Sequence, residues 1–92
     1  MIVRILGEGQ FRLDDKHLDR LNVIDNRIVD HVNKDDQIAF RKDLDDLIAA
    51  VKELGVSLNP SDIVSSDIMV PPGDLSFEEA KRVFSGTGII KD

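Results

Sequence analysis

The 92-residue sequence contains no cysteine, no tryptophan and no tyrosine, and its four aromatic residues are all phenylalanine. Without cysteine the chain has no disulfide, no thiolate for a metal ion and no cysteine nucleophile. With so few aromatic residues, the core must consist mainly of leucine, isoleucine and valine. Apolar residues make up 41% and charged residues 33% of the sequence, a balance typical of a globular domain. We therefore expect one small domain over residues 1–92.

Positive charge is in short supply, with 12 lysine and arginine residues against 18 aspartate and glutamate residues and a net charge of −6. This balance argues against nucleic acid as a partner and against direct adhesion to anionic lipid, because both rely on clustered lysine and arginine. Long hydrophobic runs are also absent, since Arg4 interrupts the apolar start. No window approaches the length of a membrane span, and no signal peptide is visible. We therefore expect a cytoplasmic protein without direct membrane insertion.

The opening fifteen residues, MIVRILGEGQFRLDD, predict a β-hairpin. A run rich in β-branched residues at 2–6 precedes a segment at 10–14 in which polar and apolar side chains alternate. Gly7 and Gly9 lie between them, where a tight turn needs the positive φ angles that glycine adopts without steric cost. A phosphate-binding loop would need a third glycine before a helix, or a lysine followed by serine or threonine. Neither is present, so the glycines are interpreted as turn residues.

Two amphipathic helices are predicted after the hairpin, because apolar residues recur every three or four positions in two successive segments. Asp14 or Asp15 is expected to cap the first helix, which ends at about Asn33. Asp35 or Asp36 is expected to cap the second helix. The connection between the two helices is short, which predicts an antiparallel pair with facing apolar stripes.

The remainder of the sequence is less regular. Gly55 is predicted to end the second helix in a left-handed conformation. A short strand is expected at 68–70, closed by the Pro-Pro-Gly sequence at 71–73, because proline donates no ladder hydrogen bond. Ser76 and Glu79 form a capping box that starts a short helix. The predicted fold is α+β, with an N-terminal β-hairpin packed on an antiparallel two-helix hairpin, a short third strand and a short C-terminal helix.

The dense aspartates raise the question of a calcium site. Along a helix each residue advances about 100°, so Asp43 and Asp45 point to nearly opposite sides and cannot converge with Asp46 on one ion. A calcium loop also needs a central glycine and a terminal glutamate, which are missing. His17 and His31 lie about 21 Å apart on the first predicted helix, too far to share a metal ion. We expect no metal and no cofactor, and keep an acidic divalent-cation-binding protein as the alternative function.

Catalytic residues are not expected either, because no serine lies in the context of an activated nucleophile. One carboxylate does break the pattern, since Asp25 falls within the apolar stripe of the first helix, where it needs a partner or an outlet to water. The alternatives are an ion pair with Arg4, Arg12 or Arg41, a place at the wet edge of the stripe, or a partly open stripe that meets another protein through Asp25.

A second candidate surface is the apolar, proline-rich segment formed by Met69, Val70, Pro71 and Pro72. Such a segment can dock a partner when it is exposed, because it has little conformational entropy to lose. Burial across the helical hairpin is the other interpretation. The sequence alone leaves both open.

Four stretches together resemble a known family: MIVRILGEGQFRLDD at 1–15, LDRLNVIDNRIVDHV at 18–32, FRKDLDDLIAAVKELG at 40–55 and SDIMVPPGDLSFEEAKRVFSGTGII at 66–90. In order, and over nearly the whole chain, they are similar to the phage shock protein A-associated domain, PspAA. The resemblance implies a partner module of phage shock protein A, a coiled-coil membrane-remodelling protein of the envelope stress response in archaea and actinobacteria. It implies no enzymatic activity and supplies no catalytic residues.

The predicted function is therefore a non-enzymatic interaction or regulatory module that binds a phage shock protein A-like coiled coil. The contact surfaces expected from the residues are the stripe around Asp25 and the segment Met69–Pro72. A helix lying in a groove is the expected mode of contact. Membrane association would come through the partner, and self-association is a further alternative.

Overall fold

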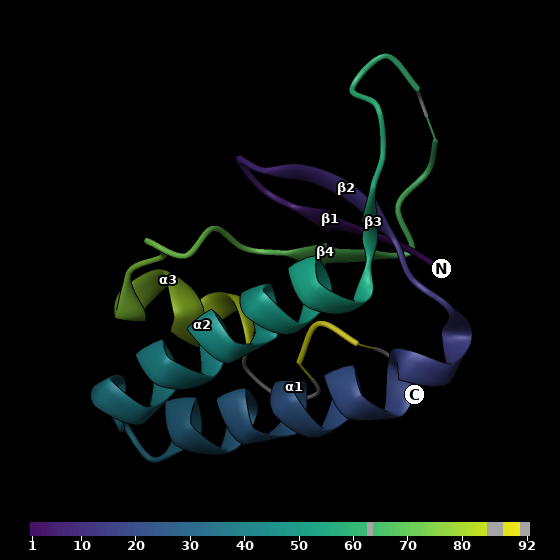
Figure 1. Cartoon of the computed structure of the whole chain (residues 1–92). Helices are drawn as coiled ribbons and strands as arrows, with labels where there is room; N and C mark the ends of the chain where they lie inside the picture. Colours follow the sequence, from purple (N-terminus) through teal and green to yellow (C-terminus); the bar gives the residue numbers. More distant parts are fainter. Residues whose placement is uncertain (63, 85–87, 91–92) are drawn as a thin grey trace.

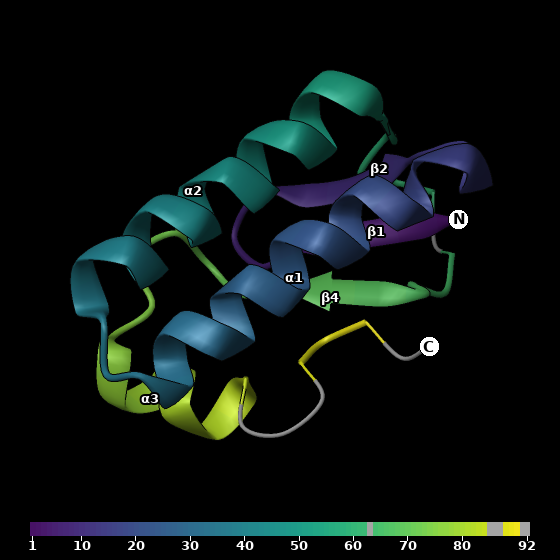
Figure 2. The same cartoon turned by 90° about the horizontal axis from the view of Figure 1, so that it is seen from below.

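Two long helices lie side by side on one face of a small sheet (Figure 1). The computed structural model describes residues 1–62, 64–84 and 88–90. Its helices are α1 (Leu18–Asn33), α2 (Gln37–Leu54) and α3 (Phe77–Val83), and a 3-10 turn at Asp15–His17 leads into α1. Seen from below, α1 and α2 run antiparallel across the strands, and α3 lies beside the turn that joins them (Figure 2). The arrangement confirms the predicted α+β fold.

Within the described residues the sheet has four strands, in the order β3-β2-β1-β4. They are β1 (Ile2–Ile5), β2 (Gly9–Arg12), β3 (Val56–Ser57) and β4 (Ile68–Val70). β1 pairs antiparallel with β2 and parallel with β4, and β2 pairs antiparallel with β3. Two parallel neighbouring strands must be joined by a long connection that crosses one face of the sheet. Between β1 and β4 this connection includes both long helices. The two-residue strand β3 was not predicted from the sequence.

Strand alternation places the apolar side chains on the helix-covered face. Val3 and Ile5 have no exposed surface, whereas Arg4 between them is exposed. The turn that follows confirms the hairpin prediction, because Gly7 has φ +88° and Gly9 has φ +104°. Neither glycine has another atom close to where a Cβ would lie, so the backbone conformation alone favours glycine there.

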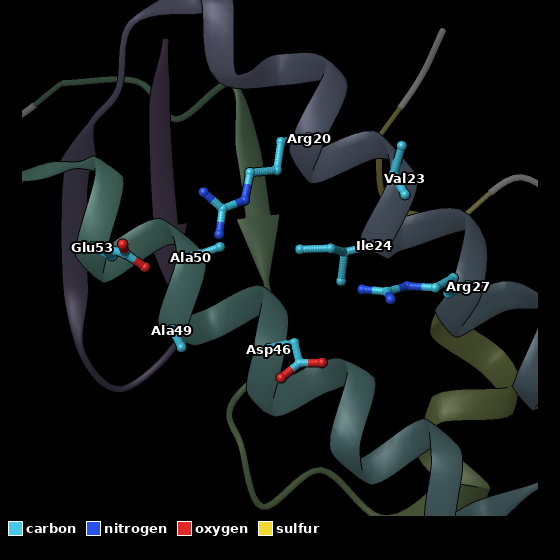
Figure 3. Close-up of a pocket in the computed structure, with 8 residues that line it drawn as sticks. All are labelled: Arg20, Val23, Ile24, Arg27, Asp46, Ala49, Ala50 and Glu53. Carbon is cyan, nitrogen blue, oxygen red and sulfur yellow. The ribbon is translucent and has the colours of Figure 1, made fainter.

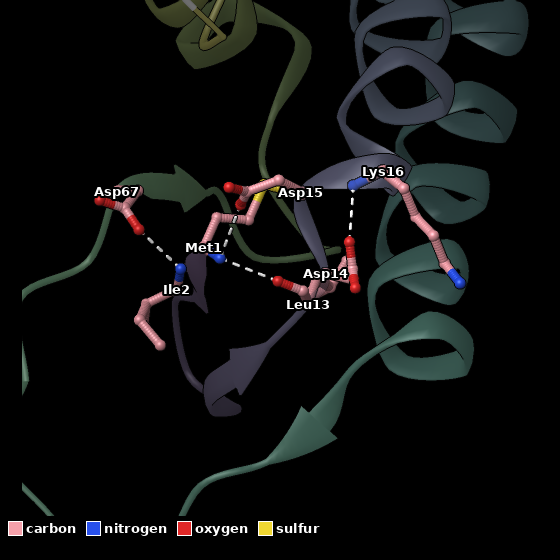
Figure 4. Close-up of polar contacts among 7 residues, drawn as sticks. All are labelled: Met1, Ile2, Leu13, Asp14, Asp15, Lys16 and Asp67. Atoms are coloured by element: carbon pink, nitrogen blue, oxygen red, sulfur yellow. Dashed lines mark hydrogen bonds and ion pairs between the residues drawn. The ribbon is translucent and has the colours of Figure 1, made fainter.

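The first strand is held by polar contacts on both sides (Figure 4). The Met1 amino group donates to the Leu13 carbonyl at 2.8 Å and pairs with the Asp15 carboxylate at 3.0 Å. The Ile2 N–H donates to the Asp67 carboxylate at 2.7 Å. The start of β1 is thereby tied both to the entry of α1 and to the residue before β4.

The predicted aspartate cap is present at α2, whereas at the first helix Asp14 caps the 3-10 turn and α1 itself begins after His17 without a side-chain cap. The Asp14 carboxylate accepts from the Lys16 backbone N–H at 2.9 Å, and this hydrogen bond lowers the pKa of Asp14 (Figure 4). Asp36 accepts from the Ala39 N–H at 3.1 Å and caps α2. Both aspartates satisfy backbone donors that the helix geometry leaves without a partner.

Helix α3 begins with the predicted capping box. Ser76 Oγ accepts from the Glu79 N–H at 3.1 Å and donates to the Glu79 carboxylate at 2.9 Å. Lys81 then reaches the turn between α1 and α2, where it pairs with Asp35 at 3.1 Å, and this contact raises the pKa of Lys81. The short helix is therefore fixed to the far end of the helical pair.

The core is aliphatic along most of its length and aromatic at one end. Phe40 of α2 is fully buried and meets the rings of Phe77 and Phe84 edge-on, at centroid distances of 5.6 and 6.2 Å. Three of the four phenylalanines thus gather where α3 packs against α2. The remaining core is built of leucine, isoleucine and valine, as the composition requires.

The predicted conformation of Gly55 is wrong. Its φ and ψ are −98° and 163°, which is extended backbone open to any residue, so no left-handed turn ends α2. The reason for glycine is steric: a Cβ here would lie 2.7 Å from the Val51 carbonyl oxygen, 2.8 Å from Leu13 Cδ1 and 3.0 Å from Phe11 Cβ. Gly55 lets the chain leave α2 directly against the hairpin.

We therefore expect Gly55→Ala to lower the free energy of unfolding by about 1–3 kcal/mol, the usual cost of overpacking. The measurement is urea denaturation followed by circular dichroism. Gly73→Ala is the matched control, because the nearest atom to a Cβ there is Ile48 Cδ1 at 3.5 Å. The control should change stability by less than about 1 kcal/mol. Equal effects of the two substitutions would contradict the steric explanation.

Candidate interaction surfaces

Asp25 lies in the interior, beneath the C-terminal segment. The residue is 0% exposed, and its two carboxylate oxygens accept from the backbone N–H groups of Ile89 at 3.2 Å and Ile90 at 3.0 Å. Gly88 has φ +79°, and a Cβ there would lie 2.6 Å from the carboxylate. A place at the wet edge of the stripe is therefore wrong: backbone amides some 64 and 65 residues away satisfy this carboxylate.

Two of the arginines expected to pair with Asp25 are directed elsewhere. Arg41 donates through both Nη atoms, to the Gly73 carbonyl at 2.5 Å and the Leu75 carbonyl at 2.6 Å. Arg4 is exposed on the sheet face that the helices do not cover. A partner would reach Asp25 only after residues 88–90 had been displaced, so a role of Asp25 in partner binding stays a prediction with that added requirement.

The Met69–Pro72 segment is partly buried. Ile68–Val70 forms the predicted strand, β4, and its alternation turns Val70 inward and Met69 outward, with exposures of 1% and 53%. Pro71 is buried and Pro72 is half-buried. Met69 lies in register with Arg4 on the uncovered sheet face. Of the four predicted contact residues, Met69 is thus the one that offers substantial surface to a partner.

A hollow that sequence analysis did not predict lies between α1 and α2, on the side away from the sheet (Figure 3). Its volume is about 490 Å³. Helix α1 lines it with Arg20, Val23, Ile24 and Arg27, and the spacing of these residues places them on one helical face. Ile24 is buried, whereas Val23 is 59% exposed. In sequence Val23 is a single apolar residue on the polar side of α1, but in the fold it belongs to this hollow.

Helix α2 lines the other side of the hollow with the same spacing, through Asp46, Ala49, Ala50 and Glu53. Small side chains form the middle of this wall and carboxylates stand at its two ends. Because the helices are antiparallel, Arg20 lies across from Glu53, and the other arginine of α1 lies across from Asp46 (Figure 3). The two walls therefore carry opposite charge, with apolar atoms between them.

One further contact joins the same two helices nearer to their connecting turn. His31 Nδ1 lies 2.5 Å from Asp43 Oδ2, and Asp43 is only 4% exposed. Asp43 is therefore not part of a solvated acidic face, whereas Asp45 is exposed. Within the described parts of the chain, no three histidine, aspartate or glutamate side chains are placed to hold a metal ion together.

Comparison with known proteins identifies a family. A family model for PspA-associated proteins (PspAA) matches residues 1–92, the full length of the sequence. Comparisons with curated proteins and with solved structures give no match. In the regions that the structure describes, none of the helices combines the length and apolar character needed to cross a membrane. The resemblance noted in the sequence is confirmed.

We expect Asp25→Asn to detach residues 88–90 and to lower the free energy of unfolding by about 1–3 kcal/mol, because an NH2 group then replaces one of the two accepting oxygens and faces a backbone N–H donor. Urea denaturation measures the loss, and hydrogen exchange at the Ile89 and Ile90 amides reports the detachment. Asp19→Asn, an exposed change on the same helix, is the control and should alter neither quantity appreciably. Unchanged exchange at both amides in Asp25→Asn would contradict the assigned contact.

Proposed function

The chain belongs to the family of PspA-associated proteins, and we propose on that basis that it is a non-enzymatic module that binds and regulates a PspA-like coiled-coil protein. The observation that carries the proposal is the match of the family model to every part of the chain. Any contact with a membrane would be made by the coiled-coil partner.

The hollow between α1 and α2 supports a helical partner. A coiled-coil protein presents long helices with apolar stripes, and such a stripe binds between two helices by inserting side chains at every third or fourth position. Val23 and Ala49 are exposed at the sides of this hollow, while Ile24 and Ala50 are buried at its base. The shape of the hollow is thus fixed by α1 and α2 before a partner binds.

A non-enzymatic role is also supported by the buried polar side chains, because each of them makes hydrogen bonds that stabilise the fold. Asp25 holds residues 88–90, and Asp43 holds His31. Gln10 donates through Nε2 to the Val64 carbonyl at 2.9 Å and to the Ser66 hydroxyl at 2.8 Å. Each of these polar groups connects two distant parts of the fold, which is a structural use.

We expect the chain to co-purify with the PspA homologue encoded in the same genome, as a complex of defined mass in size-exclusion chromatography with light scattering. The chain alone, measured over the same concentration range, controls for self-association. Met69→Asp tests the exposed residue of β4 separately, and its weakening of the complex would assign the uncovered sheet face. Absence of any complex at about 10–100 μM, where weak specific pairs are still detected, would contradict the proposed function.

A further inference from the structure

The four charged residues of the hollow differ from the His31–Asp43 contact between the same helices. His31 and Asp43 meet at 2.5 Å and close the contact near the turn. Arg20, Arg27, Asp46 and Glu53 face one another in oppositely charged pairs, yet none of them forms an ion pair or a side-chain hydrogen bond within residues 1–62, 64–84 and 88–90. The hollow of about 490 Å³ lies between these walls.

We infer that this hollow binds an amphipathic helix whose apolar stripe is flanked by acidic side chains on one side and basic side chains on the other. The inference rests on the proposed function, because the helix belongs to the coiled-coil partner. Its acidic flank faces Arg20 and Arg27 on α1, and its basic flank faces Asp46 and Glu53 on α2. Its apolar stripe covers Val23 and Ala49.

The spacing of the wall residues fits a helix in particular. On both α1 and α2 the charged residues are seven positions apart, which is two helical turns or about 10.5 Å. A partner helix lying along the hollow brings its own flank residues to the same height every seven positions. This is the arrangement by which charges beside an apolar seam select partners in coiled coils.

The apolar surface continues past the hollow along α2. Ile38, near the start of α2, is 86% exposed and lines a neighbouring hollow that also includes Asp46. The distance from Ile38 to Ala49 along the helix is about 16 Å. A bound helix of about four turns would therefore cover Val23, Ala49 and Ile38 together. All three are apolar side chains that are exposed to solvent in the fold.

The charge difference between the walls also sets the direction of the bound helix. Turning the partner helix end for end exchanges its two flanks, so that acidic side chains then face Asp46 and Glu53. Like charges brought together at an interface weaken binding and suppress the wrong arrangement. The partner helix is thus accepted in one of its two orientations along α1.

The test exchanges the charges at one end of the hollow in one variant, Arg20→Glu with Glu53→Arg, which leaves the net charge at −6. Each wall then carries one residue of each sign, so neither orientation of a partner helix matches both ends of the hollow. We expect this variant to bind the PspA homologue of the same genome at least about tenfold more weakly than the natural chain, with unchanged circular dichroism. Val23→Asp should have a similar effect. Val56→Asp is the matched control, because Val56 is 70% exposed on β3, away from the hollow, and its affinity should stay within about twofold of the natural chain.

These binding measurements distinguish a failure of the inference about the hollow from a failure of the proposed function. If the natural chain binds the homologue and the Arg20→Glu, Glu53→Arg variant binds equally well, the inference about the hollow is overturned while the proposed function stands. If the natural chain does not bind the homologue, the proposed function fails. The hollow is then tested with a synthetic helical peptide that carries leucine along one stripe, glutamate on one flank and lysine on the other. NMR shifts confined to Val23, Ala49 and their neighbours support the site, and their absence overturns it.

The direction is tested with the same peptide carrying a nitroxide at its N-terminus. The label should broaden NMR signals near one end of the hollow, either at Arg20 and Glu53 or at Arg27 and Asp46. In a variant that exchanges all four wall charges, Arg20→Glu, Arg27→Glu, Asp46→Arg and Glu53→Arg, the broadening should move to the opposite end. Broadening at the same end in both proteins, or equally at both ends, would overturn the assigned role of the wall charges.

Discussion

The parallel pairing of β1 with β4 is the constraint on which the rest of the structure depends. It sets Val3 beside Ile68 and Ile5 beside Val70, and so brings together strands that lie far apart in the sequence. A chain that leaves β1 and returns parallel to it must cross one face of the sheet on the way. Here the crossing is made by α1 and α2, which cover the apolar face and leave their own outer sides to solvent. The hollow between the helices follows from this arrangement.

Local patterns were sufficient to predict most of the elements. Gly7 and Gly9 indicated the hairpin, Asp36 and Ser76 indicated helix starts, and 3.6-residue periodicity indicated α1 and α2. These features depend on neighbours within a few residues, so the sequence contains the whole signal. The α+β class followed from their order. Strand β3 was not predicted, because two residues are too few to show an alternation of apolar and polar side chains.

Features that depend on distant neighbours were predicted less well. Asp25 was recognised as a carboxylate in an apolar stripe, but its partners are the backbone amides of Ile89 and Ile90. Every residue except proline carries a backbone N–H, so the sequence does not indicate which amides bind this carboxylate. Gly55 was assigned the right place and the wrong reason, because the contact that requires it comes from Leu13 and Phe11 in another element. The hollow depends on how α1 and α2 are rotated against each other, and that rotation is set by the packed core.

The contact between Asp25 and residues 88–90 also bears on how the chain acquires its structure. Synthesis proceeds from the N-terminus, so α1 leaves the ribosome with a carboxylate in its apolar stripe long before the amides that satisfy it exist. Strand β1 likewise waits for β4, its parallel neighbour at the edge of the sheet. Contacts of such sequence separation slow folding relative to a purely helical domain of the same size. The two helices can pair early, but the interior around Asp25 closes only when residues 88–90 lie over its carboxylate.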